Sequence, residues 1–266
     1  MTAFGLIIVG DEILSGKRQD QHLSKVIALL KERGLSLSWA EYVGDDRERL
    51  TAILQRSFAS GDVVFSTGGI GATPDDHTRQ CAAAALGLDL ELHPDAKRLI
   101  QERIMEMAST ADKPADLNTP DHLHRLKMGE FPQGAELIPN PFNKIPGFAI
   151  RQHYFVPGFP VMAWPMLAWV LDTHYSHLFH QVPHTEKSLL VFEVAESTLT
   201  PMMEQLEQKY PDVKVFSLPS VGSENIRRHI ELGVKGHPEH VHAAFAEMIE
   251  VLDGFHMEYE STLESE

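Results

Sequence analysis

The sequence contains a single cysteine and lacks any long apolar segment. With Cys81 alone, no internal disulfide bond and no zinc site built from several cysteines can form. The N-terminal apolar run at residues 4–9 is far shorter than the ~18 residues of a membrane-spanning helix, and no basic flank precedes it. These absences predict a cytoplasmic protein that has no membrane partner.

Basic residues are also scarce. The chain has 23 Lys and Arg residues against 38 Asp and Glu residues, which gives a formal net charge of −15. Such a field repels nucleic-acid backbones and anionic membrane surfaces, so we expect no nucleic-acid partner. A small phosphorylated ligand remains compatible with this charge, because backbone amides and a divalent cation act locally.

Strands and helices alternate in the first third of the chain. Apolar runs predict buried strands, and apolar residues at helical spacing predict the helices between them. Asp45 and Glu48 have the spacing of a capping pair. This order predicts an α/β fold with a doubly wound, mostly parallel sheet between two layers of helices. The predicted elements are strands at 4–9, 35–43 and 62–67 and helices at 20–33, from 45–46 onward, and at 75–86.

The rest of the chain predicts a second, smaller domain. A helix at 94–108, a polar mobile loop at 109–120, a strand at 154–156 and an apolar helix at 161–179 complete the first domain. We expect domains at residues 1–182 and 183–266, the second being a small α+β domain of order β-α-β-β-α with a fraying acidic tail from residue 258. Its predicted strands are at 188–194, 213–218 and 226–234, and its helices are at 200–210, with Thr200 as cap, and at 238–252.

A glycine-rich loop follows the third predicted strand. The segment STGGIGATPDD, residues 66–76, leads from that strand into a helix. Glycines let the backbone approach a ligand closely, and free amides at a helix start favour an anion. The spacing differs from the Walker A and Rossmann patterns, so a plain turn that needs glycine for its geometry is the alternative.

Three pairs of acidic residues follow predicted strands. They are Asp11-Glu12, Asp45-Asp46 and Asp75-Asp76. Because the carboxyl ends of parallel strands share one sheet edge, we expect the pairs to converge. Carboxylates beside phosphate are usual ligands of Mg²⁺. The alternative is that Asp45 and Asp76 only cap helices, each stabilising its helix by ~1 kcal/mol.

Several motifs together resemble a known family. GDEILSGKRQD (residues 10–20), VGDDRERL (43–50) and STGGIGATPDDHT (66–78) are similar, in this order, to the MoaB/Mog molybdopterin-binding domain. The form is that of the N-terminal domain of the competence/damage-inducible protein CinA. The likeness continues through residues 125–148 and 155–160, and so covers about residues 1–180. It implies a three-layer MoaB/Mog-like fold and a homo-oligomer, a dimer or trimer.

The resemblance also implies functional residues. The family's acidic positions fall on Asp11, Glu12, Asp45 and Asp76, and Asp45 and Asp76 are the expected catalytic and metal-binding residues. Three positions depart from the family pattern: His22 stands in place of Asn, Asn143 in place of a glycine with left-handed backbone, and Val161 in place of an acidic residue. The expected ligand-binding residues are Asp11, Glu12, Thr67, Gly68, Gly69, Gly71, Asp75, Asn140, Pro157 and Gly158.

For the reaction, the resemblance implies metal-dependent hydrolysis of ADP-ribose or a similar nucleotide at its pyrophosphate. The expected cofactor is a divalent metal such as Mg²⁺, with molybdopterin as another possible ligand. A molybdopterin adenylyltransferase of cofactor biosynthesis and a non-catalytic pterin- or nucleotide-binding protein are the alternatives. The amidase-type domain of full-length CinA proteins is not expected, and the small second domain resembles their KH-like module, for which an oligomer-building role is expected.

Overall fold

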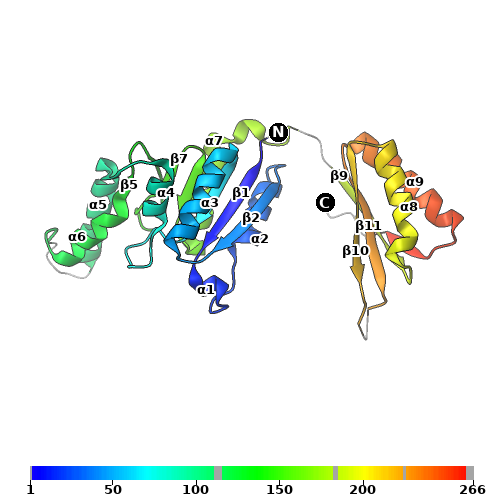
Figure 1. The fold of residues 1–266 in the computed structure, drawn as a ribbon, viewed down its shortest axis with the longest axis horizontal. Helices are drawn as coiled ribbons and strands as arrows, with labels where there is room; N and C mark the ends of the chain where they lie inside the picture. The colour runs from blue at the N-terminus through cyan, green and yellow to red at the C-terminus, as the bar shows by residue number, and fades with distance from the viewer. Residues whose placement is uncertain (1, 111–115, 182–184, 224–225, 262–266) are drawn as a thin grey trace. The chain divides into compact units, whose positions relative to one another are not determined.

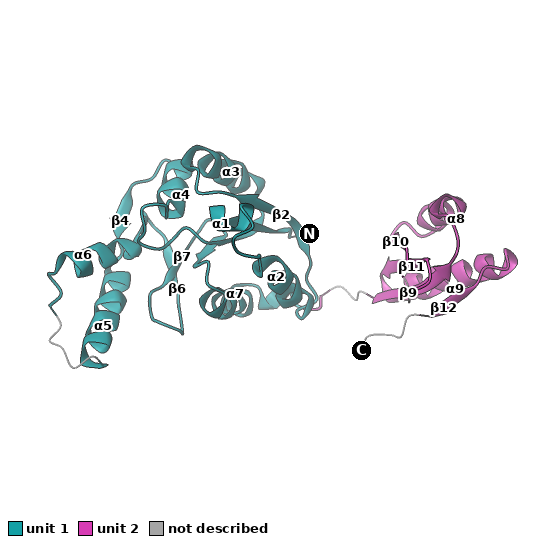
Figure 2. Cartoon of the chain, turned by 90° about the horizontal axis from the view of Figure 1, so that it is seen from below, with its two compact units in different colours: residues 1–179 teal, residues 180–266 magenta. Residues whose placement is uncertain are grey.

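The computed structural model describes residues 2–110, 116–181, 185–223 and 226–261. The chain divides into two compact units, residues 1–179 and 180–266 (Figure 2). The boundary predicted after residue 182 falls just C-terminal to this division. Within the described residues, no helix is both long and apolar enough to cross a membrane.

The first unit is built on a six-stranded sheet of order β2-β1-β3-β8-β7-β6. β1 pairs in parallel with β2 and β3, and β3 pairs in parallel with β8. Only β7 runs against its neighbours. The predicted mostly parallel sheet is therefore confirmed. The strands are β1 (Phe4–Val9), β2 (Leu37–Val43), β3 (Val63–Thr67), β6 (Glu136–Ile138), β7 (Gly147–Ile150) and β8 (His153–Val156).

Helices cover both faces of this sheet (Figure 1). The alternating side chains of β1 show the division, since Leu6 and Ile8 join one apolar core and Ile7 and Val9 join the other. Buried, mainly apolar side chains form both cores, which explains why β1 and β3 read as continuous apolar runs. The result is the predicted three-layer sandwich. The first core lies under α2 (His22–Lys31) and α7 (Pro160–His174), and the second lies under α3 (Arg47–Ser60) and α4 (Thr78–Leu86).

An arm of helices leaves the sheet after α4. The short strands β4 and β5 pair antiparallel at its base, and two helices extend from it (Figure 1). The polar loop predicted at 109–120 is shorter than expected at both ends. At its start, α5 continues to Thr110. At its end, Thr119 caps α6 by accepting a hydrogen bond from the amide of His122. Residues 111–115 lie outside the described residues. The arm comprises β4 (Leu90–Leu92), α5 (Pro94–Thr110), α6 (Pro120–Leu126), the 3₁₀ turn η1 (Lys127–Gly129) and β5 (Glu130–Pro132).

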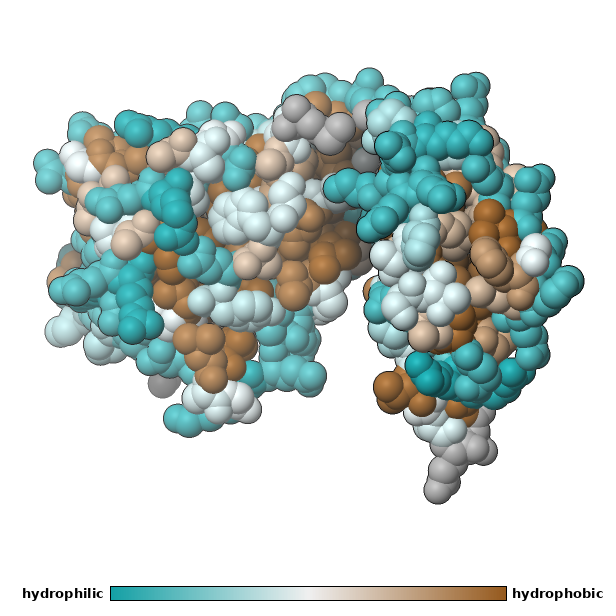
Figure 3. All heavy atoms as spheres, turned by 45° about the vertical axis from the view of Figure 1, so that its right-hand side comes forward, coloured by the Kyte–Doolittle hydropathy of each residue, from teal (hydrophilic) through white to brown (hydrophobic). Residues whose placement is uncertain are grey.

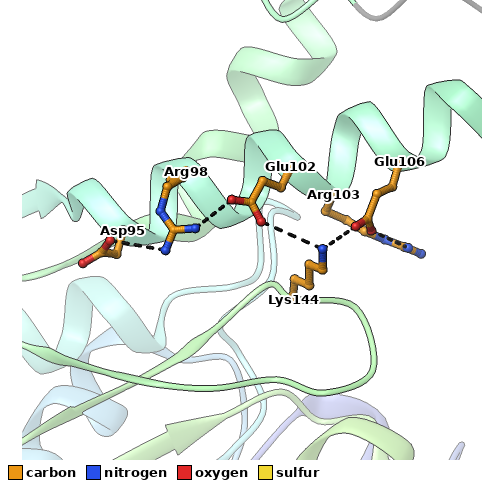
Figure 4. Close-up of polar contacts among 6 residues, drawn as sticks. All are labelled: Asp95, Arg98, Glu102, Arg103, Glu106 and Lys144. Carbon is orange, nitrogen blue, oxygen red and sulfur yellow. Dashed lines mark hydrogen bonds and ion pairs between the residues drawn. The ribbon is translucent and has the colours of Figure 1, made fainter.

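A row of charges along α5 meets the turn between β6 and β7. Lys144 of this turn contacts Glu106 and lies 3.9 Å from Glu102 (Figure 4). Asn143, which stands in place of a glycine in the family pattern, does not use left-handed backbone here; Lys144 does, with φ 67°. The side-chain oxygen of Asn143 instead closes the turn by accepting from Asn140 and from the amide of Ile145. The row of charges on α5 consists of Asp95, Arg98, Glu102, Arg103 and Glu106.

The second unit is a four-stranded antiparallel sheet of order β10-β11-β9-β12, with two helices on one face (Figure 1). The predicted helix cap at Thr200 is wrong, because buried Leu199 extends the helix to Glu196, N-terminal of Pro201. The expected fraying tail is wrong in part, because Tyr259–Ser261 pairs with β9. The elements are β9 (Thr185–Phe192), α8 (Glu196–Lys209), β10 (Val213–Ser220), β11 (His229–Gly236), α9 (Pro238–Gly254) and β12 (Tyr259–Ser261).

A buried histidine begins β8. His153 is 1% exposed, its Nδ1 donates to the carbonyl oxygen of Arg151, and its Nε2 accepts from the Ser57 hydroxyl at 2.8 Å. Burial lowers the pKa of His153 to about 4, against partial opposition from the Arg151 carbonyl and the charge of Asp62. The neutral ring thus joins α3 to the sheet.

We expect His153 to make the first unit sensitive to acid. The unfolded chain protonates this residue near pH 6.5 and the folded chain only near pH 4, so stability is lost as the pH falls between these values. The loss should approach about 3 kcal/mol. Urea unfolding from pH 7 to pH 4 measures it, and His153→Gln should flatten the profile while exposed His177→Gln should not. An unchanged slope in His153→Gln would contradict this assignment.

The first unit should also fold without the second, since it has two apolar cores of its own. A chain ending at Phe179 is expected to unfold cooperatively near the melting temperature that the full chain shows for this unit. We expect the truncation to change the oligomeric state, which sedimentation of both proteins measures. An identical assembly would remove the oligomer-building role from the second unit.

Candidate functional site

The carboxyl ends of four parallel strands meet at one edge of the first unit's sheet. The amide of Gly10, after β1, donates to the carbonyl of Val43 at the end of β2. The amide of Gly68, after β3, donates to the carbonyl of Val156 at the end of β8. The glycine-rich loop and two of the acidic pairs, Asp11-Glu12 and Asp45-Asp46, therefore leave the sheet at neighbouring strand ends.

The glycine-rich loop needs glycine for its path. Gly68 has φ 99°, and a Cβ there would lie 2.3 Å from the carbonyl oxygen of Val9. Gly69 has φ 67°, and its Cβ would lie 2.1 Å from the hydroxyl oxygen of Thr78. Both the backbone conformation and the close approach to neighbouring atoms exclude larger residues. The loop thus lies tightly between the end of β1 and the start of α4.

The carbonyl groups of this loop point toward α4. The Thr78 hydroxyl donates to the carbonyl of Gly68 at 3.1 Å, and the Thr78 amide donates to that of Gly69 at 3.0 Å. Nη2 of Arg79 donates to the carbonyl of Gly71 at 2.5 Å. Two consecutive residues of α4 therefore hold three carbonyls of the loop on one side.

The amides of the loop must then point the other way. In a trans peptide the C=O and N–H groups have opposite directions, and the described residues contain no cis peptide bond. The N–H groups of Gly69, Ile70 and Ala72 therefore face away from α4. No hydrogen bond found among the described residues uses them. Such a set of free donors is the usual backbone arrangement for binding an anion.

Asp11 and Asp45 form a reciprocal pair across two of the strand ends. The amide of Asp11 donates to the carboxylate of Asp45 at 3.0 Å, and the amide of Asp45 donates to the carboxylate of Asp11 at 3.2 Å. Burial raises the pKa of Asp45, and the charges of Asp11, Glu12 and Asp75 raise it further against the hydrogen bond from Asp11. The site therefore concentrates carboxylate charge around Asp45.

Asp76 has other partners. Its carboxylate accepts from the amide and the hydroxyl of Thr73 and so closes the end of the loop. Its charge acts on Arg79, whereas the charge of Asp75 raises the pKa of Asp45. The contact between acidic pairs that the hydrogen bonds show is the one between Asp11 and Asp45.

The predicted helix caps are wrong at both aspartates. The carboxylate of Asp45 is engaged by Asp11, and Asp46 caps α3 by accepting from the amide of Arg49 at 2.8 Å. The helix α4 begins only at Thr78, beyond the turn that Asp76 closes. Adjacent acidic residues thus have separate structural roles.

The turn at Pro157-Gly158 lies against the loop. A Cβ on Gly158 would be 3.4 Å from the Cα of Gly68. Nε2 of His22, at the start of α2, donates to the carbonyl of Gly158 at 3.0 Å. His22 is 5% exposed, and its Nδ1 has no hydrogen-bond partner among the described residues. His22, which replaces the asparagine of the family pattern, thus lies beside the Pro157-Gly158 turn.

Asn140 is buried and organises its own turn. Its amide nitrogen donates to Asn143 and to the carbonyl of Ile145, and its side-chain oxygen accepts from the amide of Phe142. Both amide hydrogens are therefore used within the turn. Asn140 holds the turn beside α7, where Asn143 contacts the sulfur of Met162 at 3.3 Å.

Hydroxyl groups at the end of β3 lack partners. Ser66 and Thr67 are 0% and 1% exposed, and neither hydroxyl has a hydrogen-bond partner in the described part of the chain. An unsatisfied buried polar group costs about 1–3 kcal/mol. The hydroxyl of Thr67, next to Gly68, is thus buried without a partner among the described residues.

Several large apolar side chains of the first unit are exposed, and Figure 3 shows brown apolar patches among polar residues on the face that it draws. Four of them belong to segments described above: Leu14 in α1 (Asp11–Leu14), Phe142 in the turn that Asn140 organises, and Phe159 and Val161 after Gly158.

The family model described as "Probable molybdopterin binding domain" matches residues 5–177. The chain belongs to this family. The matched segment contains all of the strand ends, the loop and the acidic residues described above. The first unit is thus a molybdopterin-binding-domain fold, and the predicted family is confirmed.

Similar proteins include some named as CinA or CinA-like. A CinA-like protein of Anaeromyxobacter sp. (strain Fw109-5) is 32% identical over 251 residues, which is 87% of this chain and 58% of that protein. A protein of Pyrobaculum arsenaticum is 27% identical over 85% of this chain and 84% of its own length. A crystal structure of the protein CinA "with unknown function" from Thermoplasma acidophilum superposes with a TM-score of 0.55 at 26% identity, over 64% of this chain and 98% of that one. The chain thus spans little more than half of the Anaeromyxobacter relative.

Two residues of this molybdopterin-binding domain were missed from the sequence. Arg79 donates to the carbonyl of Gly71 from the α4 side of the loop. His124 of α6 donates to the carbonyl of Ala72 at 2.6 Å. Arg79 follows the quoted loop motif directly, which is a signal that could have indicated it. His124 lies in the arm, far along the chain, and only the fold brings it to the loop.

Gly69→Ala should abolish anion binding at the loop. The new Cβ would clash with the Thr78 hydroxyl, release the carbonyls that Thr78 holds and reorient the amides. We expect no detectable heat with inorganic pyrophosphate in calorimetry. Gly87→Ala is the matched control, because Gly87 ends the same helix with φ 66° and its Cβ would meet no atom within 4 Å. It should cost about 1 kcal/mol and keep binding. Normal binding in Gly69→Ala would refute the phosphate cradle.

Proposed function

We propose that the first unit binds a phosphate-bearing nucleotide and hydrolyses its phosphoanhydride bond with the help of a divalent metal. ADP-ribose or a similar nucleotide is the proposed substrate. One observation carries the proposal: the free amides of Gly69, Ile70 and Ala72 lie on a loop whose neighbouring strand ends carry the Asp11–Asp45 pair.

Support for a phosphate ligand comes from the loop. Unpartnered amides that precede a helix complement an anion through their dipoles, whatever the net charge of the chain. The hydroxyl of Thr67 adds a further unpartnered donor beside Gly68. Exposed apolar side chains such as Phe159 suit the base of a nucleotide or a pterin ring.

Support for a divalent metal comes from the crowding of carboxylates. Asp11, Glu12 and Asp75 all raise the pKa of Asp45, so these negative charges oppose one another and would oppose a phosphate. A cation relieves this repulsion. The described residues contain no cluster of three or more side chains arranged to bind a metal. Mg²⁺ fits nevertheless, since it is often held by one or two carboxylates together with phosphate oxygens.

Asp11 and Asp45 would hold this ion. Each carboxylate accepts one amide hydrogen bond and keeps its other lone pairs. When bound, the ion would neutralise the phosphate oxygens and make phosphorus more electrophilic. Asp76 would act through the loop, by holding Thr73. In hydrolysis, the oxygen of a water forms a bond to phosphorus as the bridging P–O bond breaks. The products from ADP-ribose are AMP and ribose phosphate.

A non-catalytic binding protein is the rival that one observation favours. Val161, 56% exposed at the start of α7, stands where the family pattern has an acidic residue. Molybdopterin, which the family's description names, is an alternative ligand. The resemblance adds an adenylyltransferase reaction as the alternative enzyme. Three functions can be separated by incubating the protein with a panel of nucleotides, or with molybdopterin and ATP. Each incubation contains Mg²⁺, Mn²⁺ or Co²⁺. AMP with ribose phosphate supports hydrolysis, adenylylated pterin supports transfer, and binding without product supports the rival.

Asp45→Asn should reduce turnover while leaving the fold intact. The asparagine oxygen can still accept from the amide of Asp11, but the charge that would hold the metal is gone. We expect a fall of ~100-fold or more in metal-dependent AMP release, the size of one lost electrostatic contact in the transition state. The melting temperature should change little.

Asp46→Asn is the matched control. It removes a charge from the adjacent residue, and asparagine caps a helix about as well as aspartate. Turnover should stay within about 3-fold of the native value, because a single exposed charge has a small screened effect. Equal losses in both variants would mean that general charge, and not a metal held by Asp45, explains the effect. Full activity in Asp45→Asn would remove it from the site.

A further inference from the structure

Arg79 lies buried beneath the glycine-rich loop. It is the second residue of α4 and is 3% exposed. Its Nη2 donates to the carbonyl of Gly71, the carbonyl that precedes the free amide of Ala72. The side chain thus contacts the loop on the side opposite to the free amides.

The guanidinium group has few partners for a buried cation. The bond to Gly71 is its only hydrogen bond found among the described residues, and Nε is buried without any. Burial lowers the pKa of Arg79, and the charges of Asp76 and Glu130 oppose that shift. Burying a charge with so few hydrogen bonds is costly. Holding one carbonyl does not explain this cost, since a neutral donor would do the same.

The position of this charge offers an explanation. Carboxylates crowd the side of Asp11 and Asp45, and a phosphate on the loop amides would experience their repulsion. A cation behind the loop attracts the same phosphate through the peptide groups. In the protein interior this attraction is screened less than it would be at the surface.

We propose that Arg79 is a positioning residue for phosphate on the glycine-rich loop: it directs the amide of Ala72 outward and supplies the buried positive charge that favours an anion there. This inference rests on the proposed function only in requiring a phosphate-bearing ligand. It does not require hydrolysis. Arg79 therefore determines affinity for the phosphate group and not for the base.

Calorimetry with inorganic pyrophosphate, with and without Mg²⁺, tests this role. Arg79→Met removes the charge and the donor, and its Kd should rise at least ~10-fold, equivalent to ~1.4 kcal/mol. Arg79→Lys keeps an amino group that can donate to one carbonyl, so its Kd should lie clearly closer to the native value than that of Arg79→Met. Equal losses in both variants would show a purely structural role and overturn the inference. Adenosine, which has no phosphate, should bind all three proteins alike if it binds at all.

Glu130→Gln tests the charge without altering the loop. Glu130 begins β5, is partly exposed, and its charge acts on Arg79. Removing it leaves the positive charge less compensated, so pyrophosphate should bind about 2-fold or more tightly. Unchanged or weaker binding would contradict the inference even if Arg79→Met fails to fold. Pyrophosphate binding that depends on Arg79, in a protein that hydrolyses no nucleotide, would overturn the proposed reaction and leave this inference standing.

Discussion

The opposite directions of C=O and N–H in a planar peptide determine what the glycine-rich loop can bind. Thr78 and Arg79 draw the carbonyls of Gly68, Gly69 and Gly71 toward α4, so the amides that follow them face outward. The two glycines with positive φ make this path possible, and β3 and α4 fix its two ends. The sheet, the helix and the loop therefore act as one unit that leaves these amides unpartnered on one side of the loop.

The fold of the first unit could largely be predicted because its strands are buried on both faces and its helices are amphipathic. The arm was harder to predict. Its strands β4 and β5 have three residues each, too few for a periodic pattern, and they pair only through tertiary structure. In the second unit, the burial of Leu199 determined the start of α8 although Pro201 indicated a later one. Tertiary packing overrode the local signals in both cases.

The edge where acidic residues gather could be predicted from the sequence, but their hydrogen-bond partners could not. Parallel strand ends share an edge, so the acidic pairs were expected there, and the structure brings Asp11 and Asp45 into contact at that edge. Which member of a pair turns inward depends on hydrogen bonds across different loops. Asp11 engages Asp45 and leaves Asp46 to cap α3, whereas Thr73 donates to Asp76 and also lowers the pKa of the exposed Asp75 through a hydrogen bond. Sequence spacing contains no information on these partners.

The reciprocal bonds between Asp11 and Asp45 have an entropic consequence. Each carboxylate is fixed by the backbone of the other's segment, so both side chains are already ordered in the folded chain. Immobilising a flexible side chain on association costs roughly 0.5–1.5 kcal/mol. Here the side-chain entropy is already lost when the chain folds, so binding of an ion or nucleotide would not require it to be lost again. The two aspartates are therefore ordered before any ligand binds, and a cation bound there would relieve their mutual repulsion without having to order their side chains.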